Sequence, residues 1–121
     1  DPTSESQMIE LLVRLNRRRK ITLILATHCV DLLPVLADRI YVLRRGEVFR
    51  EGLPHDIFAD HRAAAEAGLR LPLISQLFHE LYAQHGIPVD RLPLTVEEAR
   101  QQVLDWIAAP DAAVRILGDP P

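Results

Sequence analysis

The sequence has little of what marks disulfide-rich, membrane-spanning or phosphate-cradling chains. It has one cysteine in 121 residues, so no internal disulfide can form and an oxidising compartment gets no support. No apolar run approaches the ~20 residues needed to span a bilayer, so we expect any membrane association to come through a partner. The five glycines are scattered, and none introduces the Lys-Ser/Thr pair of a phosphate-binding loop.

The sequence also lacks a large excess of charge of either sign. The formal net charge is −3, which gives no reason to expect a nucleic-acid or anionic-membrane partner. The basic run Arg17–Lys20 is either a phosphate or nucleic-acid patch or a solvated helix terminus, and the acidic total favours the terminus. The chain does not begin with methionine, and we expect Asp1 to follow a cut inside a longer protein.

The most informative stretch is Thr22–His28, which is apolar or β-branched up to a terminal histidine. A short uncharged run of this kind predicts a strand over Ile21–Thr27 that is buried on both faces, as in parallel sheets. Ligands of open parallel sheets bind beyond the carboxyl ends of the strands. We therefore expect His28 to face a site.

The residues after His28 continue an alternating α/β pattern. Asp31–Arg39 predicts a helix with Asp31 as its N-cap, and Pro34 falls in the first turn, where amides have no intrahelical partner. Ile40–Leu43 is apolar at every position and predicts a second central strand.

A hairpin is expected next. Arg45-Gly46 predicts its tight turn, and Glu47–Glu51 predicts an edge strand in which Val48 and Phe49 pack. Asp56–Phe58 predicts one short helical turn.

Helical periodicity governs the remaining helices. It predicts one helix over residues 4–18 and, in the second half, helices over 61–67, 74–82 and from 95 onward. Capping-box spacing joins Ser4 to Gln7 and Thr95 to Glu98. Glycines at 68 and 86 predict helix ends.

These elements divide the chain into two predicted parts. Residues 1–59 are α/β, a partial doubly wound sheet, and residues 60–121 are a small α-helical extension. After Pro110 only Val114, Ile116 and Leu117 are able to pack, so we expect this end to fray.

His28 is the principal candidate for chemistry, because an imidazole donates or accepts a proton near neutral pH. A Cys29–His28 nucleophile pair is disfavoured, since adjacent strand residues point to opposite faces. His55 and His61 are six positions apart, as are His79 and His85, and neither spacing places two imidazoles on one helical face. No metal-ligand set is predicted.

Several segments together resemble the end of an ATP-binding-cassette (ABC) ATPase. They are Thr22–His28 (TLILATH), Leu36–Leu43 (LADRIYVL), Arg45–Val48 (RGEV) and Glu51-Gly52, and Asp1-Pro2 resembles the end of the D-loop pattern GLDP. Residues 67–72 and 92–99 are similar to the C-terminal extension of CbiO-type ATPases of cobalt or nickel energy-coupling-factor importers.

The resemblance implies a C-terminal portion of an ABC nucleotide-binding domain. His28 then corresponds to the switch histidine that contacts the γ-phosphate, and Asp1 to the D-loop aspartate near the dimer seam. ATP and Mg²⁺ are implied for the longer protein. A second ATPase subunit and transmembrane subunits are implied as partners, with no nucleic acid, at the cytoplasmic face of the membrane.

Two departures from the family pattern matter. Cys29 stands where the family commonly has Asp or Asn after the switch histidine. The Walker A loop, signature motif and catalytic glutamate of the family fall upstream of Asp1. Two other readings stay open: a dimerisation or docking module without ATP chemistry, and a cobalt or nickel sensor that uses the histidines.

The first testable prediction concerns this chain by itself. Because it lacks the phosphate cradle, we expect it neither to bind nor to hydrolyse ATP. Calorimetric titration with ATP and magnesium measures this directly, and tight magnesium-dependent binding would contradict it.

Overall fold

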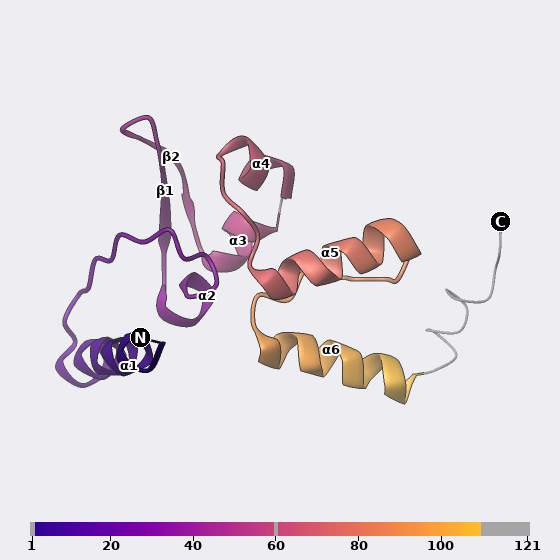
Figure 1. Cartoon of the computed structure of the whole chain (residues 1–121), viewed down its shortest axis with the longest axis horizontal. Coiled ribbons are helices and arrows are strands. Elements are labelled where there is room, and N and C mark those ends of the chain that lie inside the picture. The colour runs from indigo at the N-terminus through magenta and orange to yellow at the C-terminus, as the bar shows by residue number, and fades with distance from the viewer. Residues whose placement is uncertain (1, 60, 110–121) are drawn as a thin grey trace.

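The computed structural model describes residues 2–59 and 61–109. Its elements in chain order are α1 (Pro2–Arg19), α2 (Leu33–Leu36), β1 (Ile40–Arg44), β2 (Glu47–Gly52), α3 (Pro54–Phe58), α4 (His61–Glu66), α5 (Leu73–His85) and α6 (Val96–Ala108). The mixture of helix and strand agrees with the prediction (Figure 1). The sheet within this part of the chain is a two-stranded antiparallel hairpin.

Helix α1 forms as the periodicity predicts, with three arginines in its last turn where positive charge suits the carbonyl end. It begins at Pro2, so Ser4 lies inside it and the predicted Ser4–Gln7 capping box is wrong. Its apolar face is largely exposed, with Met8 and Leu11 more than half open to solvent. Helix α1 therefore presents an apolar stripe with little of this chain against it.

The predicted strand over Ile21–Thr27 is wrong. These residues have no regular secondary structure and every one of their side chains is exposed, Ile24 to 97%. A strand buried on both faces needs a hydrogen-bonded neighbour on each side, and β1 and β2 pair only with each other. The local pattern is that of a central strand, but the described residues supply no neighbours.

The hairpin forms as predicted. Arg45 and Gly46 both have positive φ, 51° and 83°, as a type I′ turn requires. The pairing runs from Ile40 opposite Gly52 to Arg44 opposite Glu47, with an irregularity between Val42 and Leu43.

The packing of the hairpin differs from the expectation. In β1, Ile40 and Val42 are buried while Tyr41 is exposed, so the strand has one buried face and is not central. Val48 and Phe49 are exposed, and the prediction that they pack is wrong. The register passes from Val42 opposite Arg50 to Leu43 opposite Val48, which leaves Phe49 as an extra residue in a bulge.

The helix after His28 is shorter than predicted. Helix α2 has four residues, with Pro34 in its first turn as expected. Its N-cap position is Leu32, which makes no side-chain cap, so Asp31 does not cap it. The Asp31 carboxylate instead accepts a hydrogen bond from the Leu73 N–H at 2.7 Å.

The helices of the second half follow their local signals. Gly68 and Gly86 have φ of 71° and 65° and end α4 and α5 in the left-handed conformation. The Thr95 hydroxyl accepts a hydrogen bond from the Glu98 N–H at 3.2 Å, so the predicted cap of α6 is confirmed.

Helices α5 and α6 lie together and run in the same direction, because the connector between them returns along α5 (Figure 1). The Phe78 and Trp106 rings stack with centroids 5.4 Å apart. The buried Ser75 hydroxyl donates to the Pro93 carbonyl at 2.6 Å.

The core of the described residues forms around Ile57 and Phe58 of α3, which are 1% and 0% exposed. Its buried members are Val30, Ile40, Val42, Ile57, Phe58 and Leu94, and Leu33, Ala37, Ala67, Leu69 and Leu71 pack against them. This cluster takes residues from both sides of position 59. The division into domains at that position stays a prediction, and Val114, Ile116 and Leu117 lie outside the described residues.

Because Phe58 is buried in the core and Phe49 is exposed, we expect their substitution by alanine to lower the free energy of unfolding by very different amounts. Phe58→Ala empties the centre of the cluster and should lower the free energy of unfolding by about 3–5 kcal/mol. Phe49→Ala, on the exposed bulge, is the matched control and should cost less than about 1 kcal/mol. Urea denaturation followed by circular dichroism measures both. Equal losses would show that Phe58 is not the centre of the core.

Candidate functional site

His28 lies at the surface in a turn rather than at the end of a formed strand. The Thr27 hydroxyl accepts a hydrogen bond from the Cys29 N–H at 3.0 Å, which closes the backbone around His28. The Cys29 carbonyl in turn accepts from the Leu32 N–H at 3.3 Å. The His28 side chain is exposed, but the predicted strand before it is not formed, and its role in binding a ligand stays a prediction.

Asp31 connects this turn to the second half of the chain. Its carboxylate binds the first N–H of α5, which has no side-chain cap of its own because its N-cap residue is Pro72. Val30 beside it is buried in the core. Asp1, the other site residue that the sequence predicts, lies outside the described residues.

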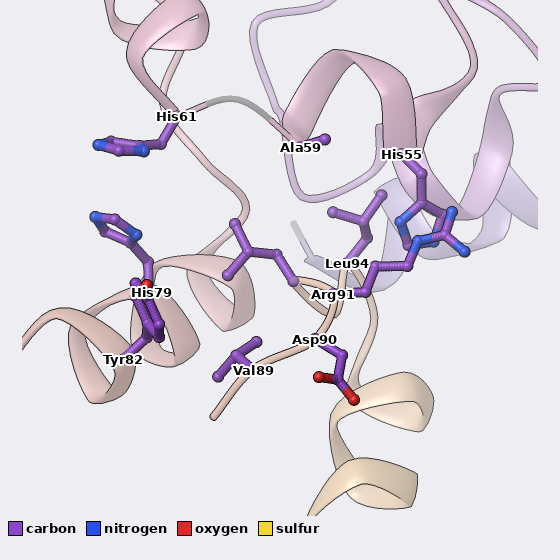
Figure 2. A pocket seen from close by; sticks show the side chains of 10 residues that line it. His55, Ala59, His61, His79, Tyr82, Val89, Asp90, Arg91 and Leu94 are labelled. Atoms are coloured by element: carbon purple, nitrogen blue, oxygen red, sulfur yellow. The ribbon is translucent and has the colours of Figure 1, made fainter. Parts of the chain in front are cut away.

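A cleft lies elsewhere in the described residues, between α3, α4, α5 and the connector before α6. It has a volume of about 290 Å³. His55, Ala59, His61, His79, Tyr82, Val89, Asp90, Arg91, Leu92 and Leu94 line it. Figure 2 shows His61 and His79 together on one wall, and His55 with Arg91 on the opposite side. His28 is not among the lining residues.

The His61 and His79 rings face each other with centroids 4.1 Å apart and planes inclined by 36°. Imidazole binds a metal through a nitrogen lone pair in the plane of the ring, so rings packed face to face do not aim their nitrogens at one ion. Across residues 2–59 and 61–109 there is no group of three His, Cys, Asp or Glu side chains able to hold a metal ion. The pair has the geometry of a stacking contact between α4 and α5.

On the opposite wall, His55 makes a hydrogen bond that joins α3 to Glu98 of α6. His55 Nε2 donates to Glu98 Oε1 at 2.9 Å, and Glu98 Oε2 accepts from the Leu94 N–H at 2.7 Å. Partial burial raises the pKa of the Glu98 carboxyl. The Leu94 N–H, His55 and the charge of Arg91 lower it further than burial raises it, so the net pKa of Glu98 lies below its ordinary value.

The sequence did not predict the contact between His55 and Glu98 or the contact between Asp31 and Leu73. His55 and Glu98 are far apart in the chain, as are Asp31 and Leu73, and no spacing rule pairs residues at such separations. The only local signal was the Thr95–Glu98 capping-box spacing, which locates Glu98 at the start of α6 but not its partner His55.

Relatives of this chain are ATP-binding subunits of ABC transporters. A protein named as an ABC transporter ATP-binding protein in Geobacter sulfurreducens is 43% identical over 105 residues, which cover 87% of this chain and 38% of that protein. No protein-family model matches the chain. Over most of its length, the chain is therefore homologous to ABC transporter ATP-binding proteins.

Energy-coupling-factor transporters are among these relatives. The ATP-binding protein EcfA2 of Clostridium perfringens is 35% identical over 106 residues, covering 88% of this chain and 37% of the relative. EcfA of Methanocaldococcus jannaschii is 36% identical over 107 residues, covering 88% and 38%. The chain thus spans little more than a third of the length of these relatives. In the described ranges, no helix has both the length and the hydropathy for a bilayer crossing.

The Glu98 network predicts a pH dependence of stability. Because the folded-state pKa of Glu98 is below its ordinary value of 4.5, its contribution is complete above about pH 4.5 and is lost as the pH falls through the folded-state pKa. Glu98→Gln should lower the free energy of unfolding by no more than about 1 kcal/mol at neutral pH, since the carboxylate is partly exposed. The difference from the unsubstituted chain should shrink towards pH 3.

Urea denaturation at several pH values tests this expectation. Glu97→Gln is the matched control, because Glu97 is an exposed carboxylate in the same first turn of α6. A loss for Glu98→Gln that stays constant down to about pH 3 would contradict the lowered pKa of the Glu98 carboxyl.

Proposed function

We propose that this chain is the C-terminal part of an ABC nucleotide-binding domain and that His28 contacts the γ-phosphate of ATP in the complete domain. The observation that carries the proposal is the homology to ABC transporter ATP-binding proteins over 87% of the chain, together with the exposed His28 at the end of its apolar segment. The proposed activity is ATP hydrolysis by the longer protein.

The exposure of the mostly apolar residues 21–27 supports the proposal that they belong to a larger sheet. Ile24 is 97% exposed and Leu25 is half exposed, which is unfavourable for aliphatic side chains in water. In the proposed domain this segment is an inner strand of a doubly wound sheet, with neighbours supplied by the remainder of the domain. His28 would then stand at the carboxyl edge, where ligands of such sheets bind.

The role of His28 follows from the chemistry of phosphoryl transfer. This reaction is catalysed mainly by positioning and by stabilising charge on the transferred phosphoryl group. An exposed imidazole in a turn closed by Thr27 and Cys29 suits a hydrogen bond to a terminal phosphate oxygen. Mg²⁺, when bound, neutralises phosphate charge, but the described residues have no group of three His, Cys, Asp or Glu side chains to hold it. In the proposed domain, the phosphate cradle and the metal ligands come from the segments that the family resemblance assigns to the Walker A and Walker B motifs.

The proposed setting is an energy-coupling-factor importer. Relatives named as energy-coupling-factor transporter ATP-binding proteins support this setting. The resemblance of residues 67–72 and 92–99 to the CbiO-type extension supports cobalt or nickel as the transported ion. Asp1 is proposed to lie near the seam with a second ATPase subunit. Transmembrane subunits complete the assembly at the cytoplasmic face of the membrane.

A docking module without ATP chemistry is the second candidate. The observation in its favour is the apolar surface on the second half of the chain. Val96, Leu104 and Ile107 of α6 are half or more exposed, as are Leu73 and Tyr82 of α5. A partner that covers this surface would give the helices a binding role.

A chimaera tests the ATPase proposal. The matching segment of EcfA of Methanocaldococcus jannaschii is replaced by this chain, and ATP hydrolysis and ATP binding are measured. His28→Ala in the chimaera should reduce kcat by about 10²-fold or more, as removal of a transition-state donor does, while ATP still binds.

The matched control is His85→Ala, an exposed histidine at the end of α5. It should leave hydrolysis unchanged. Undiminished hydrolysis in the His28→Ala chimaera would refute the assignment of His28, and a chimaera that folds and binds ATP but never hydrolyses it would favour the docking module.

A further inference from the structure

The start of α5 depends on a residue from the other half of the chain. Its N-cap position is Pro72, whose side chain cannot accept a hydrogen bond. The first helical N–H, that of Leu73, instead donates to Asp31 Oδ1 at 2.7 Å. A carboxylate bound to a first-turn N–H gains both a charge-assisted hydrogen bond and a favourable interaction with the helix dipole. Asp31 thus does for α5 what a local cap normally does.

The same carboxylate lies on the turn that carries His28. Successive hydrogen bonds hold this turn together: Cys29 N–H to the Thr27 hydroxyl, Leu32 N–H to the Cys29 carbonyl, and Leu33 N–H to the Val30 carbonyl. Val30 is buried in the core, and Leu69 and Leu71 pack against that core just before α5. The backbone between His28 and Asp31 is therefore constrained at several points.

Helix α5 is in turn joined to α6. Ser75 Oγ bonds the Pro93 carbonyl while fully buried, and Phe78 stacks on Trp106. The aromatic contact joins α5 to α6 directly, and the polar contact joins α5 to the connector that leads into α6. Asp31 is the polar contact between α5 and the His28 turn.

We propose that Asp31 is a positioning residue that makes the orientation of the His28 turn depend on the docking of α5. The functional meaning of this coupling rests on the proposed function, because it gives the helical extension control over the residue that contacts the γ-phosphate. The coupling itself concerns only this chain and needs no nucleotide.

Nuclear magnetic resonance of the unliganded chain tests the coupling. Leu73→Pro removes the donor N–H, and proline is favoured at the first position of a helix, so α5 is retained. The Leu73 side chain is 73% exposed, so its loss disturbs little packing. Leu73→Ala is the matched control, because it removes the same side chain and keeps the N–H.

We expect Leu73→Pro to shift the His28 imidazole and Cys29 amide resonances, although it is remote from them in sequence, and Leu73→Ala to leave them in place. Asp31→Ala should shift the His28 imidazole resonances as Leu73→Pro does. It should also speed hydrogen exchange of the Leu73 amide roughly tenfold. The double variant Asp31→Ala, Leu73→Pro should shift the His28 ring no further than either single variant. Asp31→Asn retains an acceptor oxygen and should restore most of the original spectrum.

Two results would overturn the proposal. One is that Leu73→Pro lowers the melting temperature of the chain but does not shift the His28 imidazole resonances. Asp31 would then have a purely structural role. The other is additive shifts in the double variant, since residues in one interaction do not act independently. Asp38 is an exposed carboxylate near the same segment, and Asp38→Ala should change neither the His28 resonances nor the exchange of the Leu73 amide. Failure of the ATPase chimaera would not alter these spectra, so the two proposals fail separately.

Discussion

The apolar cluster around Ile57 and Phe58 is the interaction on which the rest of the structure depends. Full burial of two such side chains contributes roughly 1.5–3 kcal/mol each, and they are 1% and 0% exposed. The cluster holds the hairpin through Ile40 and Val42, and it holds the second half of the chain through Leu94. The contacts made by Asp31 and Glu98 are possible because this core sets the two halves of the chain against each other.

Residues 21–25, in contrast to the core residues, are mostly apolar but not buried. Their composition is that of an inner strand, yet they are exposed and unpaired, while the hairpin closes on itself. Inner strands of parallel sheets gain their stability from neighbours that are distant in sequence. The relatives are far longer than this chain, and a strand of that kind is understandable as part of a larger sheet, as the proposed function requires.

Features encoded by neighbouring residues were predicted from the sequence. The Arg45-Gly46 turn, the left-handed Gly86 and the Thr95 cap each follow from the conformational preferences of one or two residues. The exposed Phe49 was not predicted, because the bulge depends on register between two strands. His28 was predicted to face a ligand site from the end of a strand; the strand does not form, the side chain is exposed, and its contact with phosphate stays a prediction. The partners of Asp31 and Glu98 depend on the tertiary fold and have no signal in local spacing.

The stacking of Trp106 on Phe78 has a practical consequence. Trp106 is the single tryptophan of the chain, so intrinsic indole fluorescence reports on one location, the contact between α5 and α6. Emission should move to longer wavelength when these helices separate and water reaches the ring. The indole emission of the unlabelled protein therefore follows the contact between these two helices.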